Sequence, residues 1–429
     1  MRSNKVFKKI QIFFAVITLC WFWAGTATAQ TGAPNQEKLL NGLKVLMWSD
    51  PKADTVSVRV RIHSGSAFDP QGKEGVMRLL ADSLFPSDAA RDFFVEDLGG
   101  SLEVTTNYDY IEVNASSKPQ NFLTMLETVA TAVSDPQINK EVTTQIRSSL
   151  QKRLGELEAN PTYFADITAA KRLFGTFPYG RPQLGSTDSV KKIDFADLID
   201  ARQRFLTADN ATVVIIGNFD RTLGFRAIRR YFGNWLKSDR KVPSTFKQPD
   251  DPPADLLVVA SPQPKAAAVR FAFRGPARSD KDLAASLIFA SIIESRLKAR
   301  VPEAHKDVVF VKGHAHVLPG SIVIGFSAGE NEVGPGHGKV EANDLVSKAL
   351  SDPITEAEFM TAIRAVQGEW SKRDLPSFWL DADTYKIASP KADLRVVETV
   401  TVSDVRSYAE RARMRPIVSV LVNTRPKSK

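Results

Sequence analysis

The stretch Gly72–Phe85, which reads G-K-E-G-V-M-R-L-L-A-D-S-L-F, decides the fold of this chain. Its apolar residues recur near helical spacing after a loop that carries glycine. These residues are Val76, Leu79, Leu80 and Leu84. The pattern predicts a short, buried helix. Arg78 and Asp82 lie four residues apart on it and can form an ion pair; the alternative is that both point to solvent and contribute little.

The chain has 429 residues, a length that suits two domains of ordinary size. Its composition is that of a globular protein. A nucleic-acid-binding role would require basic residues clustered with aromatic ones, and the sequence has no such stripe. Arg226, Arg229 and Arg230 are predicted to form a solvated helix face instead. We therefore expect no nucleic-acid partner.

Residues 1–29 have the features of a secretory signal peptide. A basic start precedes the apolar run Ile10–Ala24 and the small-x-small site Ala27-Thr28-Ala29. We expect cleavage after Ala29, a periplasmic location and no membrane attachment afterwards. A retained anchor is the alternative, but the run is short for a span of roughly 20 residues. Cys20, the only cysteine, would leave with this segment, so we expect no disulfide and no cysteine ligand for zinc.

Alternating and helical patterns divide the mature chain into two similar halves, residues 30–236 and 255–429. Strands are predicted at Leu40–Ser49, Thr55–Ser64, Ser101–Ser117, Ala211–Gly217, Leu256–Ala260, Ala267–Arg274, Val308–Leu318, Ser321–Ala328 and Pro416–Val422. Further helices are predicted at Ala90–Leu98, Lys118–Ser134, Asn139–Glu158, Tyr163–Phe174, Asp194–Phe205, Leu223–Trp235, Ser279–Arg300, Gly338–Ser351, Thr355–Asp374, Ala382–Ala388 and Ser403–Arg413.

Both halves run strand, strand, helix, strand, helices, strand, which indicates a duplication. The polar, proline-bearing stretch Lys237–Ala254 is the predicted linker. We expect an α+β fold of two tandem homologous domains, each a mixed β-sheet with helices packed on one face. Two such domains joined by a linker would clasp a chamber.

Several stretches carry a resemblance to a known family. They are L-N-G-L-K-V (Leu40–Val45), H-S-G-S (His63–Ser66), F-P-Y-G-R-P (Phe177–Pro182), N-A-T-V-V-I-I-G-N-F-D (Asn210–Asp220) and S-R-L (Ser295–Leu297). The chain resembles the pitrilysin/insulinase family of zinc peptidases, the inverzincins. Within it, the chain is similar to the short two-domain bacterial members that resemble subunits of mitochondrial processing peptidase.

The resemblance places this chain's metal positions on the predicted helix. Where the family carries the inverted zinc motif H-x-x-E-H, this sequence has Arg78, Ala81 and Asp82. The family's third ligand, a glutamate, falls on Arg153, although Glu156 and Glu158 lie within a turn of it. Arginine cannot act as a ligand, and one Asp with one Glu makes a poor zinc site. We therefore expect a degenerate site without zinc, in which Arg153 helps Arg78 and Asp82 fill the polar space.

The family also holds the substrate backbone with an Arg and a Tyr from the second domain. The resemblance places Arg296 at the Arg position and Phe310 near the Tyr position, so that one hydroxyl contact with substrate would be missing. The alternative for Arg296 is a helix-surface cation near Glu294. His63 falls on the polar face of its strand and is predicted to face solvent. His314 and His316 share one side of a predicted strand, where a two-histidine metal site is a further alternative.

What the resemblance implies is a non-catalytic homologue. It would be the partner subunit of a catalytic paralogue that carries the zinc, and it would help to form a chamber for unfolded peptide. Two alternatives stay open: an active zinc metalloendopeptidase with unusual ligands, and a stand-alone periplasmic peptide-binding protein.

Overall fold

The computed structural model describes residues 32–238, 246–262, 267–301, 303–328 and 338–423. The predicted signal peptide, residues 1–29, lies outside these ranges. The first half contains β1 (Asn35–Lys38), β2 (Lys44–Ser49), β3 (Val56–Ile62), α1 (Val76–Asp82), α2 (Ala89–Asp92), β4 (Ser101–Thr106), β5 (Ile111–Ser117), α3 (Phe122–Ser134), α4 (Lys140–Glu158), α5 (Pro161–Phe174), α6 (Thr187–Val190), α7 (Phe195–Phe205), β6 (Ala211–Gly217) and α8 (Arg221–Phe232).

The second half repeats this order with fewer short helices. It contains β7 (Leu256–Ala260), β8 (Ala267–Arg274), α9 (Leu283–Arg300), β9 (Val309–His314), β10 (Ser321–Ala328), α10 (Gly338–Ser351), α11 (Glu356–Ser371), α12 (Leu375–Tyr385), α13 (Pro390–Leu394), α14 (Val402–Arg413) and β11 (Val418–Asn423). Within the described ranges, none of these helices is both long and apolar enough to cross a membrane.

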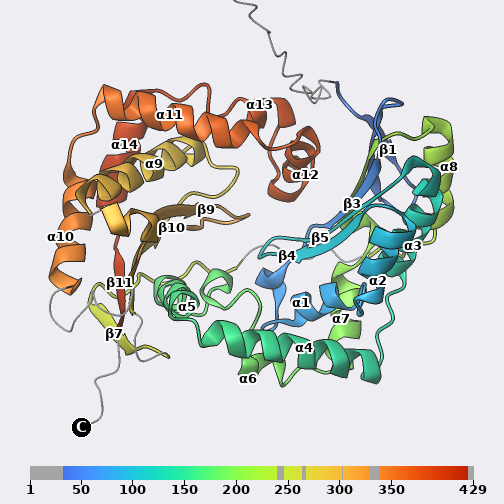
Figure 1. Ribbon diagram of the computed structural model, residues 1–429, viewed down its shortest axis with the longest axis horizontal. Helices are drawn as coiled ribbons and strands as arrows, with labels where there is room; N and C mark the ends of the chain where they lie inside the picture. The colour runs from blue at the N-terminus through green and yellow to red at the C-terminus, as the bar shows by residue number, and fades with distance from the viewer. Residues whose placement is uncertain (1–31, 239–245, 263–266, 302, 329–337, 424–429) are drawn as a thin grey trace, which may run out of the picture.

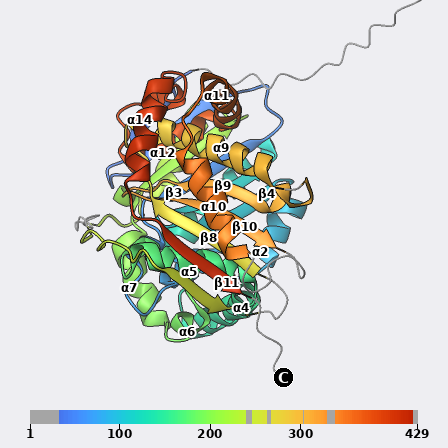
Figure 2. The same ribbon diagram turned by 90° about the vertical axis from the view of Figure 1, so that its left-hand side faces the viewer.

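The two sheets have the same topology. The first runs β1-β2-β6-β3-β5-β4 and the second β7-β11-β8-β10-β9. The β2–β6 and β7–β11 pairs are parallel, and the other neighbours are antiparallel. Strand for strand, the second sheet repeats the first without β1. The predicted α+β fold with duplicated mixed sheets is confirmed (Figures 1 and 2).

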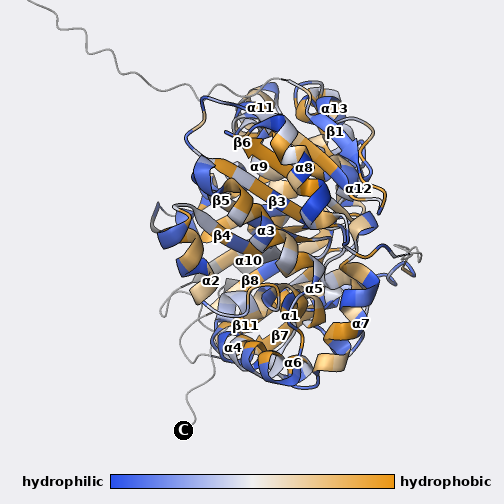
Figure 3. Ribbon diagram, turned by 90° about the vertical axis from the view of Figure 1, so that its right-hand side faces the viewer, coloured by the Kyte–Doolittle hydropathy of each residue, from blue (hydrophilic) through white to orange (hydrophobic). Residues whose placement is uncertain are grey.

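Helices of each half cover one face of their own sheet. In the first half, inward residues of β2, β3, β5 and β6 form one apolar core with α1, α3, α7 and α8. Figure 3 views this half from outside, with α3 and α8 in front of the strands. In the second half, inward residues of β8, β9 and β10 form a second core with α9, α10, α11 and α14.

The opposite face of each sheet is covered by a helix from the other half. Helix α5 packs on β8 and β11 through Ala165 and Ala169. Helix α12 packs on β2 and β6, where Leu380 contacts the cluster around Trp48. Figure 1 shows α5 beside the second sheet and α12 beside the first. This reciprocal exchange joins the halves. The sequence predicted helices on one face of each sheet, and the structure shows that a helix of the other half covers the second face as well.

Several predicted elements differ from the structure. Strand β9 ends at His314, so His316 lies outside the strand on which the sequence placed both histidines, and the expected helix Ala90–Leu98 is the short α2 followed by a π-helical turn, Phe93–Asp97. The expected strand Ser101–Ser117 is the hairpin β4–β5, because the side chain of Asn107 accepts hydrogen bonds from the backbone of Asp109 and Tyr110 and closes a turn. The expected helix Ala382–Ala388 is α12, which begins earlier. Asp374 accepts from the backbone nitrogen of Ser377 and caps it, with a proline in its first turn.

Candidate functional site

Helix α1 is the short, buried helix predicted from Gly72–Phe85. It begins after Gly75, whose φ of 108° favours glycine and whose missing side chain leaves room for Val190. The carboxylate of Asp69 accepts hydrogen bonds of 2.8 Å from the backbone nitrogens of Gly75 and Met77. An anion at this end of the helix satisfies amides that have no partner in the helix itself.

Arg78 and Asp82 pair along one face of α1. Arg78 Nη2 lies 2.7 Å from Asp82 Oδ1, and Nε donates to Oδ2 over 3.1 Å. Both side chains are partly buried, at 16% and 23% exposure. Burial raises the pKa of the Asp82 carboxyl, against the opposing effect of Arg78. The pair does not extend to Arg153, which is exposed on α4 and has no ion pair within the described part of the chain.

The residues at the predicted metal positions do not fit zinc. Arg78 and Arg153 carry permanent positive charges, and Ala81 is a buried methyl group. Glu158 accepts hydrogen bonds of 2.9 Å from the backbone and hydroxyl of Thr187, which occupies its carboxylate at the start of α6. Across the described ranges, no group of three or more His, Cys, Asp or Glu side chains could hold a metal ion.

A cavity of about 710 Å³ lies between the two halves. Helices α1, α2, α4 and α5, strand β4 and the F-P-Y-G-R-P segment form its wall on one side, and β8, β9 and β10 form the other. Glu103, Val104, Thr105 and Thr106 of β4 line it, and β4 is the last strand of its sheet. Apolar groups of α5 and β10, including Ile167 and Val323, complete the surface. The cavity therefore offers a sheet edge, apolar surface and charge together.

Phe310 lines this cavity from β9, and two cations face its ring. The guanidinium of Arg270 lies 4.9 Å from the ring centre and Lys312 Nζ lies 5.0 Å from it. His314 and His316 line the same wall. His316 Nδ1 lies 2.9 Å from Asp109 Oδ2, so its ring binds a first-half carboxylate across the boundary.

Arg296 lies elsewhere and is held within the second half. Its side chain is 7% exposed, and it is not among the cavity's lining residues. It donates to both carboxylate oxygens of Glu358, over 2.6 and 2.9 Å, and to the backbone carbonyls of Ala349, Asp352 and Pro353. Glu294 pairs with Lys298 instead, so the alternative of a surface cation near Glu294 is wrong. These contacts give Arg296 a structural position and lend its predicted role in substrate binding no support.

The predicted solvent-facing position of His63 is also wrong. Its ring nitrogens lie 3.0 Å from the hydroxyls of Thr384 on α12 and Thr212 on β6. Burial, with Lys386, Arg61 and Lys44 nearby, lowers the pKa of His63 to about 3. The alternating pattern marked this face as polar, and the structure shows that a helix of the other half covers it.

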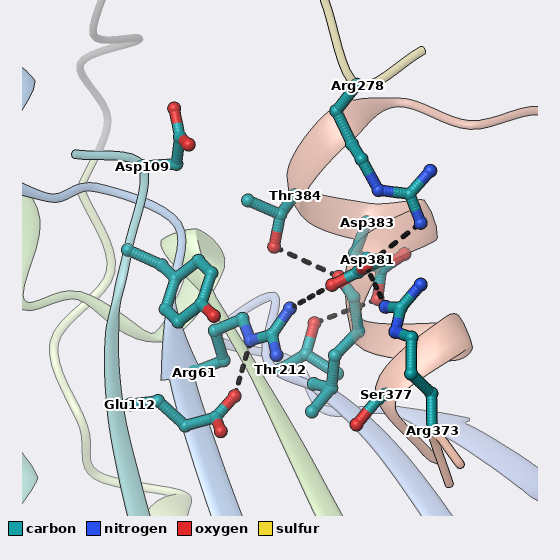
Figure 4. Close-up of polar contacts among 12 residues, drawn as sticks. Arg61, Asp109, Glu112, Thr212, Arg278, Arg373, Ser377, Asp381, Asp383 and Thr384 are labelled. Atoms are coloured by element: carbon teal, nitrogen blue, oxygen red, sulfur yellow. Dashed lines mark hydrogen bonds and ion pairs between the residues drawn. The ribbon is translucent and has the colours of Figure 1, made fainter. Parts of the chain in front are cut away.

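Asp381 is the centre of a buried ion network beneath α12 (Figure 4). Its Oδ1 accepts from Arg61 Nη1 over 2.7 Å, and its Oδ2 accepts from Arg278 over 3.1 Å and from Arg373. Glu112 completes the coordination of Arg61 at 2.5 Å. Burial opposes the charged form of Asp381, but the three arginines outweigh it and hold the pKa of the carboxyl below its usual range.

The second sheet repeats this contact. Arg270 of β8 is fully buried, and its Nε donates to Asp166 of α5 over 2.5 Å. In each half, a buried arginine on equivalent strands, β3 and β8, thus binds an aspartate on the helix supplied by the other half. The helices share a pattern of a proline, two aromatic residues and an aspartate, in P-T-Y-F-A-D (161–166) and P-S-F-W-L-D (376–381). Sequence reasoning missed this repeat, which was the available signal for both contacts.

These features define a duplicated, two-domain α+β protein whose cavity lies beside a helix without metal ligands. Residues 44–184 match the family model described as Insulinase (Peptidase family M16), and residues 192–366 match the model of the Peptidase M16 inactive domain. The chain belongs to the insulinase family. The match of the second half to the inactive domain and the residues at the metal positions of the first half both support a non-catalytic homologue of the family's peptidases.

Known proteins with similar sequence or structure agree with the family assignment. A Rickettsia bellii protein named "Uncharacterized zinc protease" is 20% identical over 213 residues, which is 48% of this chain and 51% of that protein. A "Probable mitochondrial-processing peptidase subunit beta" of Arabidopsis thaliana is 24% identical over 49% of this chain and 40% of its own. The chain spans about half the length of these curated relatives.

Among solved structures, the peptidase M16 inactive domain from Pseudomonas fluorescens is similar over 92% of this chain and 99% of its own. Its TM-score is 0.80 and its sequence identity is 19%. This likeness concerns the fold of the whole described chain.

Proposed function

We propose that this chain is a non-catalytic subunit that binds extended segments of unfolded peptide in the cavity between its halves. The observation that carries the proposal is the open edge of β4 along the cavity wall. Within the described residues β4 pairs only with β5, and an unpaired strand edge can accept an extended chain through backbone hydrogen bonds. Apolar side chains of α5 and β10 would contact alternate side chains of the bound segment.

The Arg78–Asp82 pair supports binding without hydrolysis. It stands where the resemblance places the metal, and no group there can activate water as a metal-bound hydroxide would. Cleavage would then belong to a zinc-bearing paralogue working beside this chain. A relative named as a peptidase subunit supports a partnership of this kind. With the signal-like residues 1–29, the proposed location is the periplasm.

Peptide binding is tested with a fluorescent unfolded peptide and its anisotropy on mixing with the mature chain. Ala170 lies on α5 and lines the cavity, so Ala170→Trp should fill part of it and weaken binding at least tenfold. Ala196→Trp places the same ring on the exposed start of α7 and should leave affinity unchanged. Equal binding by both variants would show that the peptide does not bind in the cavity. No binding by the parent chain would contradict the proposed peptide binding itself.

Partnership is tested separately by purifying the tagged chain from its own periplasm. Co-elution of a paralogue with an intact H-x-x-E-H motif is the expected result. Elution of the chain without such a paralogue, combined with peptide binding, would favour the stand-alone binding protein.

A further inference from the structure

Basic side chains outnumber acidic ones in the lining of the cavity, whereas a metal site would be lined by acidic or neutral ligands. Five of its lining side chains are Arg or Lys and two are Asp or Glu. One of those acids, Asp166, is already paired with Arg270. The cavity wall therefore carries an excess of positive charge even though its neighbours include Asp82.

Some of these cations are engaged within the fold. Arg78 is paired with Asp82, and Arg181 donates to the backbone carbonyls of Asp69 and Ala67. The others are Arg91 on α2, Arg153 on α4 and Lys312 on β9, which are exposed and have no ion pair in the described ranges. Two helices of the first half and one strand of the second half thus each place in the cavity wall a cation that has no ion-pair partner among the described residues.

Arg78, Arg91 and Arg153 line the same cavity, and Asp82 pairs with Arg78 alone within the described ranges. Burial raises the pKa of the Asp82 carboxyl, although all three arginines favour its charged form. Arg78 is paired with Asp82, so Arg91 and Arg153 keep no carboxylate partner in the described ranges, and Glu103 is the one other acid of the lining besides Asp166. Concave walls of low polarity strengthen the field of such charges and raise the local concentration of anions.

From this geometry we propose that the cavity selects unfolded segments rich in Asp and Glu, whose carboxylates bind Arg91 and Arg153. This rests on the proposed peptide-binding function and names its substrate class. Bidentate guanidinium–carboxylate contacts suit this pairing. The apolar groups of α5 and β10 and the open edge of β4 favour a polypeptide over another polyanion.

The test uses three unstructured peptides of equal length and equal apolar content, with Glu, Gln or Lys at the same positions. Anisotropy at low salt should show the Glu peptide binding at least tenfold more tightly than the Gln peptide, and the Lys peptide more weakly still. Raising the ionic strength should narrow these differences. The double variant Arg91→Gln, Arg153→Gln should lose most of the Glu preference and keep its affinity for the Gln peptide.

Arg229→Gln is the matched control, because Arg229 is exposed on α8 away from the cavity. It should leave all three affinities unchanged. Equal affinity for the Glu and Gln peptides would overturn the acidic preference while leaving peptide binding intact. Absence of binding by every peptide would overturn the proposed function itself. Tighter binding of a single-stranded oligonucleotide of equal charge would overturn the assignment to a polypeptide.

Discussion

Arg61 and Asp381 join the two halves of the molecule, with Nη1 and Oδ1 2.7 Å apart and both side chains less than a tenth exposed. The same kind of contact recurs between Arg270 and Asp166 in the second sheet. Because each helix leaves its own half to cover the opposite sheet, these pairs hold the two halves together. Asp166 also lines the cavity, whereas Arg61 and Asp381 lie outside its lining.

Asp381→Asn should destabilise the chain strongly. It removes the shared negative charge from Arg61, Arg278 and Arg373, and breaking a buried ion network by removing one partner costs about 3 kcal/mol or more. The measurement is the urea midpoint followed by tryptophan fluorescence. Asp200→Asn is the control, since the Arg204–Asp200 pair is largely exposed and worth less than about 1 kcal/mol. Equal midpoints for the two variants would contradict the structural role of Asp381.

Asp166→Asn should have a smaller effect than Asp381→Asn. Asp166 is 47% exposed, and Arg270 keeps the carbonyl oxygens of Val269 and Phe326 as acceptors. We expect a loss of roughly 1–3 kcal/mol in the same urea experiment, the range for a buried group that loses one charged partner. A loss as large as that of Asp381→Asn would show that the two contacts are equivalent in energy as well as in geometry.

Stability should fall at mildly acidic pH because of His63. Its pKa is about 3 in the folded chain, against an ordinary value of 6.5, so the unfolded chain binds a proton first as pH falls. The contribution of neutral His63 to the free energy of unfolding is intact above pH 6.5. It is lost progressively between pH 6.5 and 3, by up to about 1.4 kcal/mol per pH unit. His63→Gln should flatten that part of the pH–stability curve. An unchanged curve would mean that the hydroxyls of Thr212 and Thr384 accommodate the imidazolium.

Restoring ligands should test the alignment of the metal helix. The variant Arg78→His, Asp82→His, Arg153→Glu supplies two histidines at i and i+4 and a carboxylate from α4, a set that zinc accepts. It should bind about one zinc ion per chain by metal analysis after dialysis, and the parent chain should bind none. Retained zinc in the parent, or none in the variant, would show that α1 and α4 are misaligned with the family.

The local patterns of the sequence predicted most of the fold but not the interface between the halves. Buried helix α1 and the duplicated strand order follow from periodicity, because each half forms its core from its own strands and helices. His63 was misplaced because alternation distinguishes a polar face from an apolar one, not a solvated face from one covered by a distant helix. The turn closed by the Asn107 side chain was missed because the alternation of polar and apolar residues continues from β4 through the turn into β5.

The roles predicted for the candidate site residues stay predictions. Arg78, Arg153 and Phe310 line one cavity. Arg296 lies away from it because its five hydrogen bonds hold it against Glu358 and the carbonyls at the end of α10 and just after it. Such competing partners arise only in the folded chain.

Native mass spectrometry of the mature chain, incubated with zinc and an unfolded acidic peptide, tests the central claim most directly. We expect a complex of one chain with one intact peptide and no added zinc. A zinc-bearing chain accompanied by peptide fragments would contradict it.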